Sequence, residues 1–124
     1  MKNHAVYVYK QAPVLGQPLF RRGTLTIFDR KILSILQSEA DRRHLDWNIS
    51  VDETEGDVSR LRERDYDLII CTPFVYRWLL GKQVNSSKVV FLTVMEYYQS
   101  LTRYRQSSVN RVLSFMEQLD RKTG

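Results

Sequence analysis

The stretch Tyr66-Asp67-Leu68-Ile69-Ile70-Cys71 carries the clearest secondary-structure signal in the chain. Its last four residues are all apolar, and Thr72-Pro73 follows directly. A short apolar run without polar alternation is typical of a parallel strand that is covered on both faces. The stretch therefore predicts the central strand of a parallel sheet.

Three other segments have strand patterns that agree with this sheet. The segment from Lys88 to Thr93 repeats the apolar run with Val89-Val90-Phe91-Leu92. Ala5 to Tyr9 alternates aliphatic and aromatic residues, and Trp47 to Val51 forms a further short strand pattern. Four strands are therefore expected.

Helical patterns separate the strands. Thr26 and Asp29 have the spacing of a capping box and open an amphipathic helix that runs to about His44. A last helix begins near Ser107 or Ser108, with apolar residues at helical spacing. Two short helices are expected at 57–61 and 74–80, whereas Val94 to Tyr104 is predicted to be a loop.

The alternation of strands and helices predicts one α/β domain over residues 1–124. We expect a three-layer sandwich around a four-stranded, mainly parallel sheet. In such folds ligands bind beyond the carboxyl ends of the strands. The loops at that edge are therefore the first places to look for a site.

The composition is that of an ordinary globular protein. Hydrophobic residues make up 43% of the 124 residues and charged residues 27%. The apolar runs are too short to cross a bilayer, and the first residues lack a signal-peptide pattern. The single cysteine excludes an internal disulfide framework. These features predict a cytoplasmic protein without a membrane segment.

The whole pattern resembles the cellobiose/lactose-type IIB proteins of the sugar phosphotransferase system. The first strand, the run Asp67 to Leu79 with its proline turn, and the ending from Lys88 onward carry this resemblance. It implies a four-stranded parallel sheet of flavodoxin-like order 2-1-3-4 and a phosphate-carrying cysteine at the end of the first strand. Similar domains are also found in transcription regulators of the Mga type.

The chain departs from that family where the chemistry would take place. Lys10 stands where the nucleophilic cysteine is expected, and Gln11 and Ala12 follow it. A lysine amine is a poor nucleophile at neutral pH and does not replace a thiolate in phosphate relay. The resemblance therefore implies a degenerate domain with no catalytic residue carried over, and it leaves enzymatic activity uncertain.

A candidate anion site surrounds the start of the first helix. A glycine before a helix N-terminus presents free backbone N–H groups, and adjacent guanidinium groups bind phosphate through paired hydrogen bonds. The alternative is an ordinary helix start beside surface arginines. The residues of this candidate site are Lys10, Arg21, Arg22, Gly23, Thr24 and Thr26.

Two other patterns were considered as catalytic or metal sites, and neither predicts one. Cys71 and Arg77 have the spacing of the phosphotyrosine phosphatase loop. The residues between them are bulky, however, whereas that loop is rich in glycine. Cys71 is therefore interpreted as a small hydrophobe that ends a buried strand. The two histidines, His4 and His44, have no carboxylate or cysteine at a spacing typical of metal sites. No metal or cofactor is therefore predicted.

An aromatic and basic segment provides the candidate interface. Interleaved tyrosines and arginines anchor protein interfaces and also stack on nucleic-acid bases. Alternatively, the tyrosines pack over the sheet edge. Of the two functional interpretations, a protein interface and a nucleic-acid interface, we favour the protein interface, which includes a homodimer. The residues concerned are Tyr97, Tyr98, Arg103, Tyr104 and Arg105.

Three functions remain open from the sequence. The preferred one is a non-catalytic regulatory or protein-interaction domain linked to sugar phosphotransferase signalling or transcription regulation. The second is an active IIB phosphoryl carrier that uses another residue. The third is a basic nucleic-acid-binding protein, suggested by the formal net charge of +5.

Overall fold

The computed structural model describes residues 3–9, 25–52, 66–73 and 88–123. Four strands form one sheet in the order β2-β1-β3-β4, and all neighbouring strands are parallel. This confirms the predicted α/β class and strand order. The strands are β1 (Asn3–Val8), β2 (Trp47–Val51), β3 (Leu68–Cys71) and β4 (Val89–Phe91).

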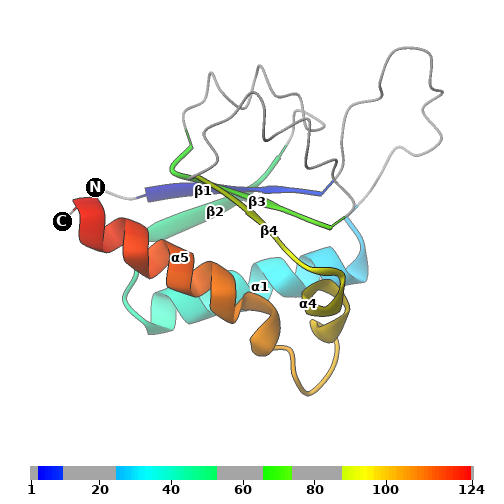
Figure 1. Cartoon of the computed structure of the whole chain (residues 1–124). Helices are drawn as coiled ribbons and strands as arrows, with labels where there is room; N and C mark the ends of the chain where they lie inside the picture. Colours follow the sequence, from blue (N-terminus) through cyan, green and yellow to red (C-terminus); the bar gives the residue numbers. More distant parts are fainter. Residues whose placement is uncertain (1–2, 10–24, 53–65, 74–87, 124) are drawn as a thin grey trace, which may run out of the picture.

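Three helices lie on the same side of this sheet (Figure 1). They are α1 (Ile27–Arg42), α4 (Val94–Gln99) and α5 (Ser107–Thr123). Within the described ranges, none of them has the length and apolar character needed to cross a bilayer. The short helices expected at 57–61 and 74–80 lie outside the described residues.

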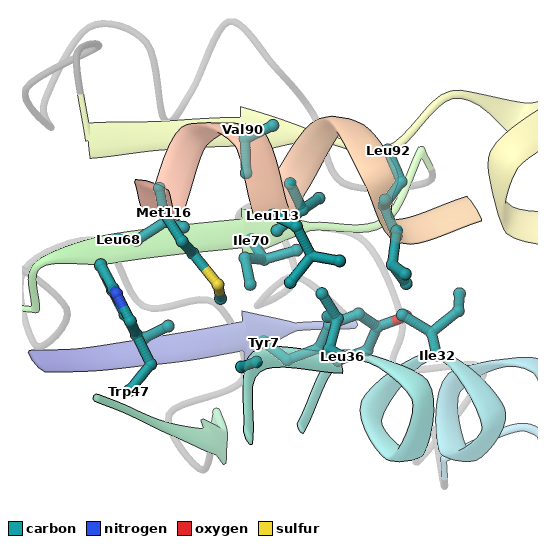
Figure 2. Packing of buried hydrophobic residues seen from close by; sticks show 14 of the residues in the cluster. Tyr7, Ile32, Leu36, Trp47, Leu68, Ile70, Val90, Leu92, Leu113 and Met116 are labelled. Atoms are coloured by element: carbon teal, nitrogen blue, oxygen red, sulfur yellow. The ribbon is translucent and has the colours of Figure 1, made fainter. Parts of the chain in front are cut away.

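Both faces of the sheet are buried, which explains the unbroken apolar run in β3. On the helical face, side chains from the strands meet apolar residues of α1 and α5 (Figure 2). On the opposite face, Val6, Val8, Ile69 and Cys71 form a second buried cluster. Because successive side chains of a strand point to opposite faces, β1 and β3 supply residues to both clusters. The helical-face core centres on Tyr7, Ile32, Leu36, Trp47, Leu68, Ile70, Val90, Leu113 and Met116.

Both ends of α1 are closed by local hydrogen bonds. At its start, Thr26 and Asp29 form the predicted capping box, which confirms that expectation. At its end, His44 takes the left-handed conformation with φ of 59°, and its N–H donates to the carbonyl of Asp41. The N–H of Leu45 donates to the carbonyl of Ala40, which completes a Schellman motif.

The segment predicted as a loop from Val94 to Tyr104 begins with a helix instead. Thr93 caps α4, and its hydroxyl accepts a hydrogen bond from the N–H of Glu96 at 3.1 Å. The Glu96 carboxylate accepts one from the N–H of Thr93 at 2.8 Å. This reciprocal pair satisfies two donors that a helix start otherwise leaves open. The loop prediction was therefore wrong for residues 94–99.

Candidate functional site

A partly buried polar cluster joins β1, α1 and α4 near the carboxyl end of the sheet. The hydroxyl of Tyr7 donates to the Asp29 carboxylate at 2.6 Å. The other Asp29 oxygen lies 2.9 Å from the N–H of Thr26 and 3.0 Å from its hydroxyl. The Thr26 and Tyr97 hydroxyls are 2.6 Å apart. This chain of bonds fixes α4 against the start of α1.

Burial sets the ionisation of this cluster. Tyr7 is fully buried, and its pKa is raised far above the ordinary value, first by burial and then by the bonded Asp29 carboxylate. Burial also raises the pKa of Tyr97, although the hydrogen bond with Thr26 acts in the other direction. Both phenols therefore remain neutral at physiological pH. Because their polar atoms already have partners, the cluster is a structural connection between the elements.

Of the six predicted anion-site residues, only Thr26 is among the described residues. Its hydroxyl is engaged with Asp29 and Tyr97 inside the polar cluster. Lys10, Arg21, Arg22, Gly23 and Thr24 lie outside the described residues. The anion site stays a prediction, and the bonds of Thr26 give its side chain a capping role.

Cys71 is fully buried as the last residue of β3, and it lies beside Val8 of β1. This is the position expected of a small hydrophobe that ends a strand. Arg77, its partner in the phosphatase-like spacing, lies outside the described residues. Within the described ranges, no three side chains of the metal-binding types gather into a possible metal site.

Helix α4 is fastened to α5 by an ion pair. The guanidinium of Arg111 donates to both carboxylate oxygens of Glu96, at 2.8 and 3.3 Å. Burial raises the pKa of Glu96, but the bonds from Arg111 and the Thr93 N–H outweigh it, so the net shift is below the ordinary value. Glu96 is therefore ionised at neutral pH. The helix is held from two sides, by Glu96 and by Tyr97.

The outer side of α4 exposes large apolar side chains. Val94 is 54% exposed, Met95 69% and Tyr98 48%. Their positions are one, three or four residues apart, so they share one face of the helix. With Thr93, Gln99 and Thr102 they line an open hollow of about 630 Å³. The core-facing side carries the buried Tyr97.

A second hollow of about 450 Å³ continues this surface toward α1. It is lined by Ile27, Leu101 and Ser34, together with the cations Arg30, Lys31 and Arg105. Leu101 and Thr102 are adjacent in the chain and line one hollow each, so the two hollows are neighbours. We call the exposed apolar group the α4 surface: Ile27, Val94, Met95, Tyr98, Leu101 and Tyr104.

The α4 surface contains every large hydrophobic residue that is exposed in the described part of the chain. All six belong to the first turn of α1, to α4 or to the segment that follows α4. Scattered exposed apolar residues are normal on a soluble protein, whereas their concentration in one region indicates a contact surface. This concentration is the most distinctive surface feature of the described residues.

Four of the five predicted interface residues are exposed, and one is buried. Tyr98, Arg103, Tyr104 and Arg105 are exposed, and the guanidinium of Arg103 lies 5.0 Å from the centre of the Tyr104 ring. Tyr97 is only 3% exposed, and its ring packs against Phe28 at 5.3 Å between ring centres. The side chain of Tyr97 therefore belongs to the core and not to the exposed surface.

Sequence reasoning missed the apolar members Ile27, Val94, Met95 and Leu101. The capping-box spacing of Thr93 and Glu96 was a signal for α4. Had the helix been recognised, residues 94, 95 and 98 would have been placed on one face. Their exposure depends on which face turns toward the core, and that face carries Tyr97, which bonds to Thr26 and packs against Phe28.

The two outer strands of the sheet each have a side chain bonded to their outward-facing backbone. The amide of Gln37 donates to the Trp47 carbonyl at 3.2 Å and accepts from the Ile49 N–H at 3.3 Å, as a neighbouring strand would. On β4, Arg111 donates to the carbonyl of Phe91. Such bonds protect strands from pairing with other chains.

Replacing Gln37 by leucine should lower the free energy of unfolding by about 1 kcal/mol, because two backbone groups lose their partner. The opened β2 edge should also promote concentration-dependent self-association. Denaturant unfolding and light scattering measure these two effects. Gln118→Leu, an exposed position on α5, adds the same apolar surface without touching an edge. Equal behaviour of the two variants would contradict edge protection by Gln37.

Comparisons with known proteins give this chain no relatives. A scan against protein-family models, a search of curated proteins and a search of solved structures each found no match. The functional argument therefore depends on the α4 surface and its surroundings.

Proposed function

We propose that this chain is a non-catalytic protein-interaction domain that binds its partner through the α4 surface. The observation that supports this most strongly is the gathering of all six exposed large hydrophobic residues of the described chain in one region. Contiguous exposed apolar area with a polar margin is a common feature of protein-binding sites. The adjoining hollows offer space for side chains of a partner.

The way in which α4 is held also supports binding. The polar cluster and the Glu96–Arg111 ion pair attach the helix to α1 and α5. A surface on such a rigid element loses little conformational entropy when a partner binds. On the edges of β2 and β4, in contrast, the backbone groups of Trp47, Ile49 and Phe91 are already bonded to side chains and are not open to a partner strand.

The link to sugar phosphotransferase signalling or transcription regulation is part of the proposal and rests on the sequence resemblance alone. A regulatory domain of that type in the cytoplasm would keep the sheet and lose the phosphate-accepting thiol, as Lys10 indicates. The competing function is an active phosphoryl carrier. Incubation with a radiolabelled, phosphorylated donor of the IIA type separates the two. We expect no transfer of label, and stoichiometric transfer would overturn the non-catalytic proposal.

The binding proposal is tested by site-specific photocrosslinking in extract of the source cells. A benzophenone amino acid is placed at position 98 in the α4 surface, or at the exposed position 118 on α5 as the control. We expect a discrete adduct at position 98 and none at 118. The adduct should disappear when Met95→Asp is added, because a carboxylate in the apolar surface opposes burial.

The captured protein is then purified and titrated with the unlabelled chain. Wild-type chain should bind it, and Met95→Asp should weaken binding at least tenfold while leaving the melting temperature unchanged, since residue 95 is exposed. Adducts of equal yield at both positions, or equal binding by the variant, would refute the α4 surface as the binding site.

A further inference from the structure

We infer that the segment which binds the α4 surface is acidic and amphipathic, and that it belongs to a different protein and not to a second copy of this chain. This inference rests on the proposed function and adds the chemistry of the partner. It follows from the charges that border the apolar residues. The cations concerned are Arg30, Lys31, Arg103 and Arg105.

Among the described residues, these cations have no acidic partner. Within residues 3–9, 25–52, 66–73 and 88–123, no ion pair joins any of the four to a carboxylate. Two carboxylates of α1 and α4 already have partners: Asp29 lies inside the polar cluster, and Glu96 is bonded to Arg111. None of the described residues that line the two hollows is acidic.

An acidic segment complements such a border. Its apolar side chains would cover Met95, Tyr98 and Leu101, and its carboxylates would face the cations of α1 and of the segment after α4. Complementary charges increase the association rate and exclude wrongly charged partners. Arginine adds paired hydrogen bonds to a carboxylate, which a lysine does not provide.

A second copy of the chain is a poor occupant of the same surface. A two-fold symmetric dimer presents the same patch on both subunits. Four cations of one subunit would then meet four cations of the other, and the described lining of the hollows supplies no carboxylate between them. Like charges brought together in an interface oppose association. The homodimer predicted from the sequence is therefore not the arrangement we propose for this surface.

Nucleic acid matches the cations but not the apolar residues. Single-stranded nucleic acid binds by stacking its bases on aromatic rings. Ile27, Val94, Met95 and Leu101 offer no ring to stack on, and together they make up most of the α4 surface. Aliphatic side chains of a partner protein bury this area better than sugars and phosphates do.

A helix is the form in which the partner segment fits best. An extended segment that pairs with a sheet edge would meet Gln37 or Arg111, whose side chains already bond to the outer strands. An amphipathic helix instead places apolar residues at positions three and four apart into a groove beside another helix. The two neighbouring hollows along α4 and the start of α1 are suited to that spacing.

The test uses a synthetic helical peptide with leucines on one face and glutamates on the other. Two matched peptides serve as controls, one with lysine at every glutamate position and one with the leucine positions scrambled. Binding to the full chain is measured by fluorescence anisotropy at several salt concentrations and mapped by amide chemical shifts. We expect the acidic peptide to bind most tightly, to shift residues 95, 98 and 101, and to weaken with added salt.

Charge reversal supplies the decisive comparison. In the double variant Arg30→Glu and Arg105→Glu, affinity for the acidic peptide should fall about tenfold, and the lysine peptide should become the better ligand. Unchanged preference would overturn the inference. So would concentration-dependent shifts of the same residues without peptide, which indicate a dimer, or tighter binding of single-stranded DNA at this surface.

The outcomes separate this inference from the proposed function. If photocrosslinking captures a partner at position 98 but the acidic and lysine peptides bind equally, the protein-binding function stands and its acidic specificity fails. If no adduct forms at position 98 and no peptide binds, the proposed function itself fails.

Discussion

Replacement of Asp29 by alanine should lower the free energy of unfolding by about 3 kcal/mol, as measured by denaturant unfolding. Asp29 is 2% exposed, and its carboxylate accepts hydrogen bonds from the Tyr7 hydroxyl and the Thr26 N–H. Its loss leaves the buried hydroxyl of Tyr7 without this partner, which costs the desolvation of that group. It also removes half of the capping box at the start of α1.

Two controls isolate the cause of that loss. Asp46→Ala removes an exposed carboxylate near β2 and should change stability by less than about 0.5 kcal/mol. The double variant Tyr7→Phe with Asp29→Ala should be less destabilised than the sum of its single changes, because no hydroxyl is left unpartnered. Strict additivity would show that the Tyr7–Asp29 bond does not couple the two residues.

The Asp29 variant also probes the connection between the core and the α4 surface. Thr26 bonds to Asp29 on one side and to Tyr97 of α4 on the other. Loss of the carboxylate frees Thr26 from one of these bonds and should loosen the hold on α4. The same hydrogen-bond chain therefore stabilises the fold and positions the surface that we propose for binding.

Local sequence patterns predicted the regular elements well. Leu68 to Cys71 was recognised as a buried strand because both of its faces require apolar residues. Trp47–Val51 has the predicted bounds, and Ser107 begins the last helix as expected. The strand order was predicted together with the fold class, and the structure confirms it. These features depend on neighbours in the sequence or on general rules of parallel sheets.

The features that make the site depend on distant contacts. Tyr97 and Tyr98 are adjacent and chemically alike, yet one is buried and the other is 48% exposed. Tyr97 turns toward distant residues: its hydroxyl bonds to Thr26, 71 positions away, and its ring packs against Phe28. No local pattern contains that information. The apolar character of the α4 surface was missed for the same reason, because exposure is a property of the packed molecule.

The protected sheet edges are another long-range feature. Gln37 looks like any polar residue on the solvent side of an amphipathic helix. Only the packing of α1 beside β2 brings its amide to the outward-facing backbone of Trp47 and Ile49. Arg111 has the same double role on the other edge, where it also binds Glu96. These bonds make strand pairing a less suitable way to bind a partner than contact with the α4 surface.

Raising the pH above about 10 should destabilise this protein through Tyr7. The folded-state pKa of Tyr7 lies above its ordinary value of 10.0, because the phenol is buried against a carboxylate. A raised pKa means that the contribution of this group to stability is complete below pH 10 and decreases as the pH rises further. Unfolding then releases one more proton, so the free energy of unfolding should fall by about 1.4 kcal/mol per pH unit from this group.

The variant Tyr7→Phe isolates that contribution from the other titrating groups. Lysines and the remaining tyrosines are common to both proteins, so the difference between the two pH slopes reports Tyr7. We expect a steeper decline in the wild type between pH 10 and 11.5, measured by denaturant unfolding. The absorbance of ionised tyrosine should show fewer than all seven tyrosines titrating before the structure is lost. Equal slopes, or ionisation of all seven in the folded protein, would contradict a buried Tyr7–Asp29 bond and remove the hydrogen-bond chain on which the position of α4 depends.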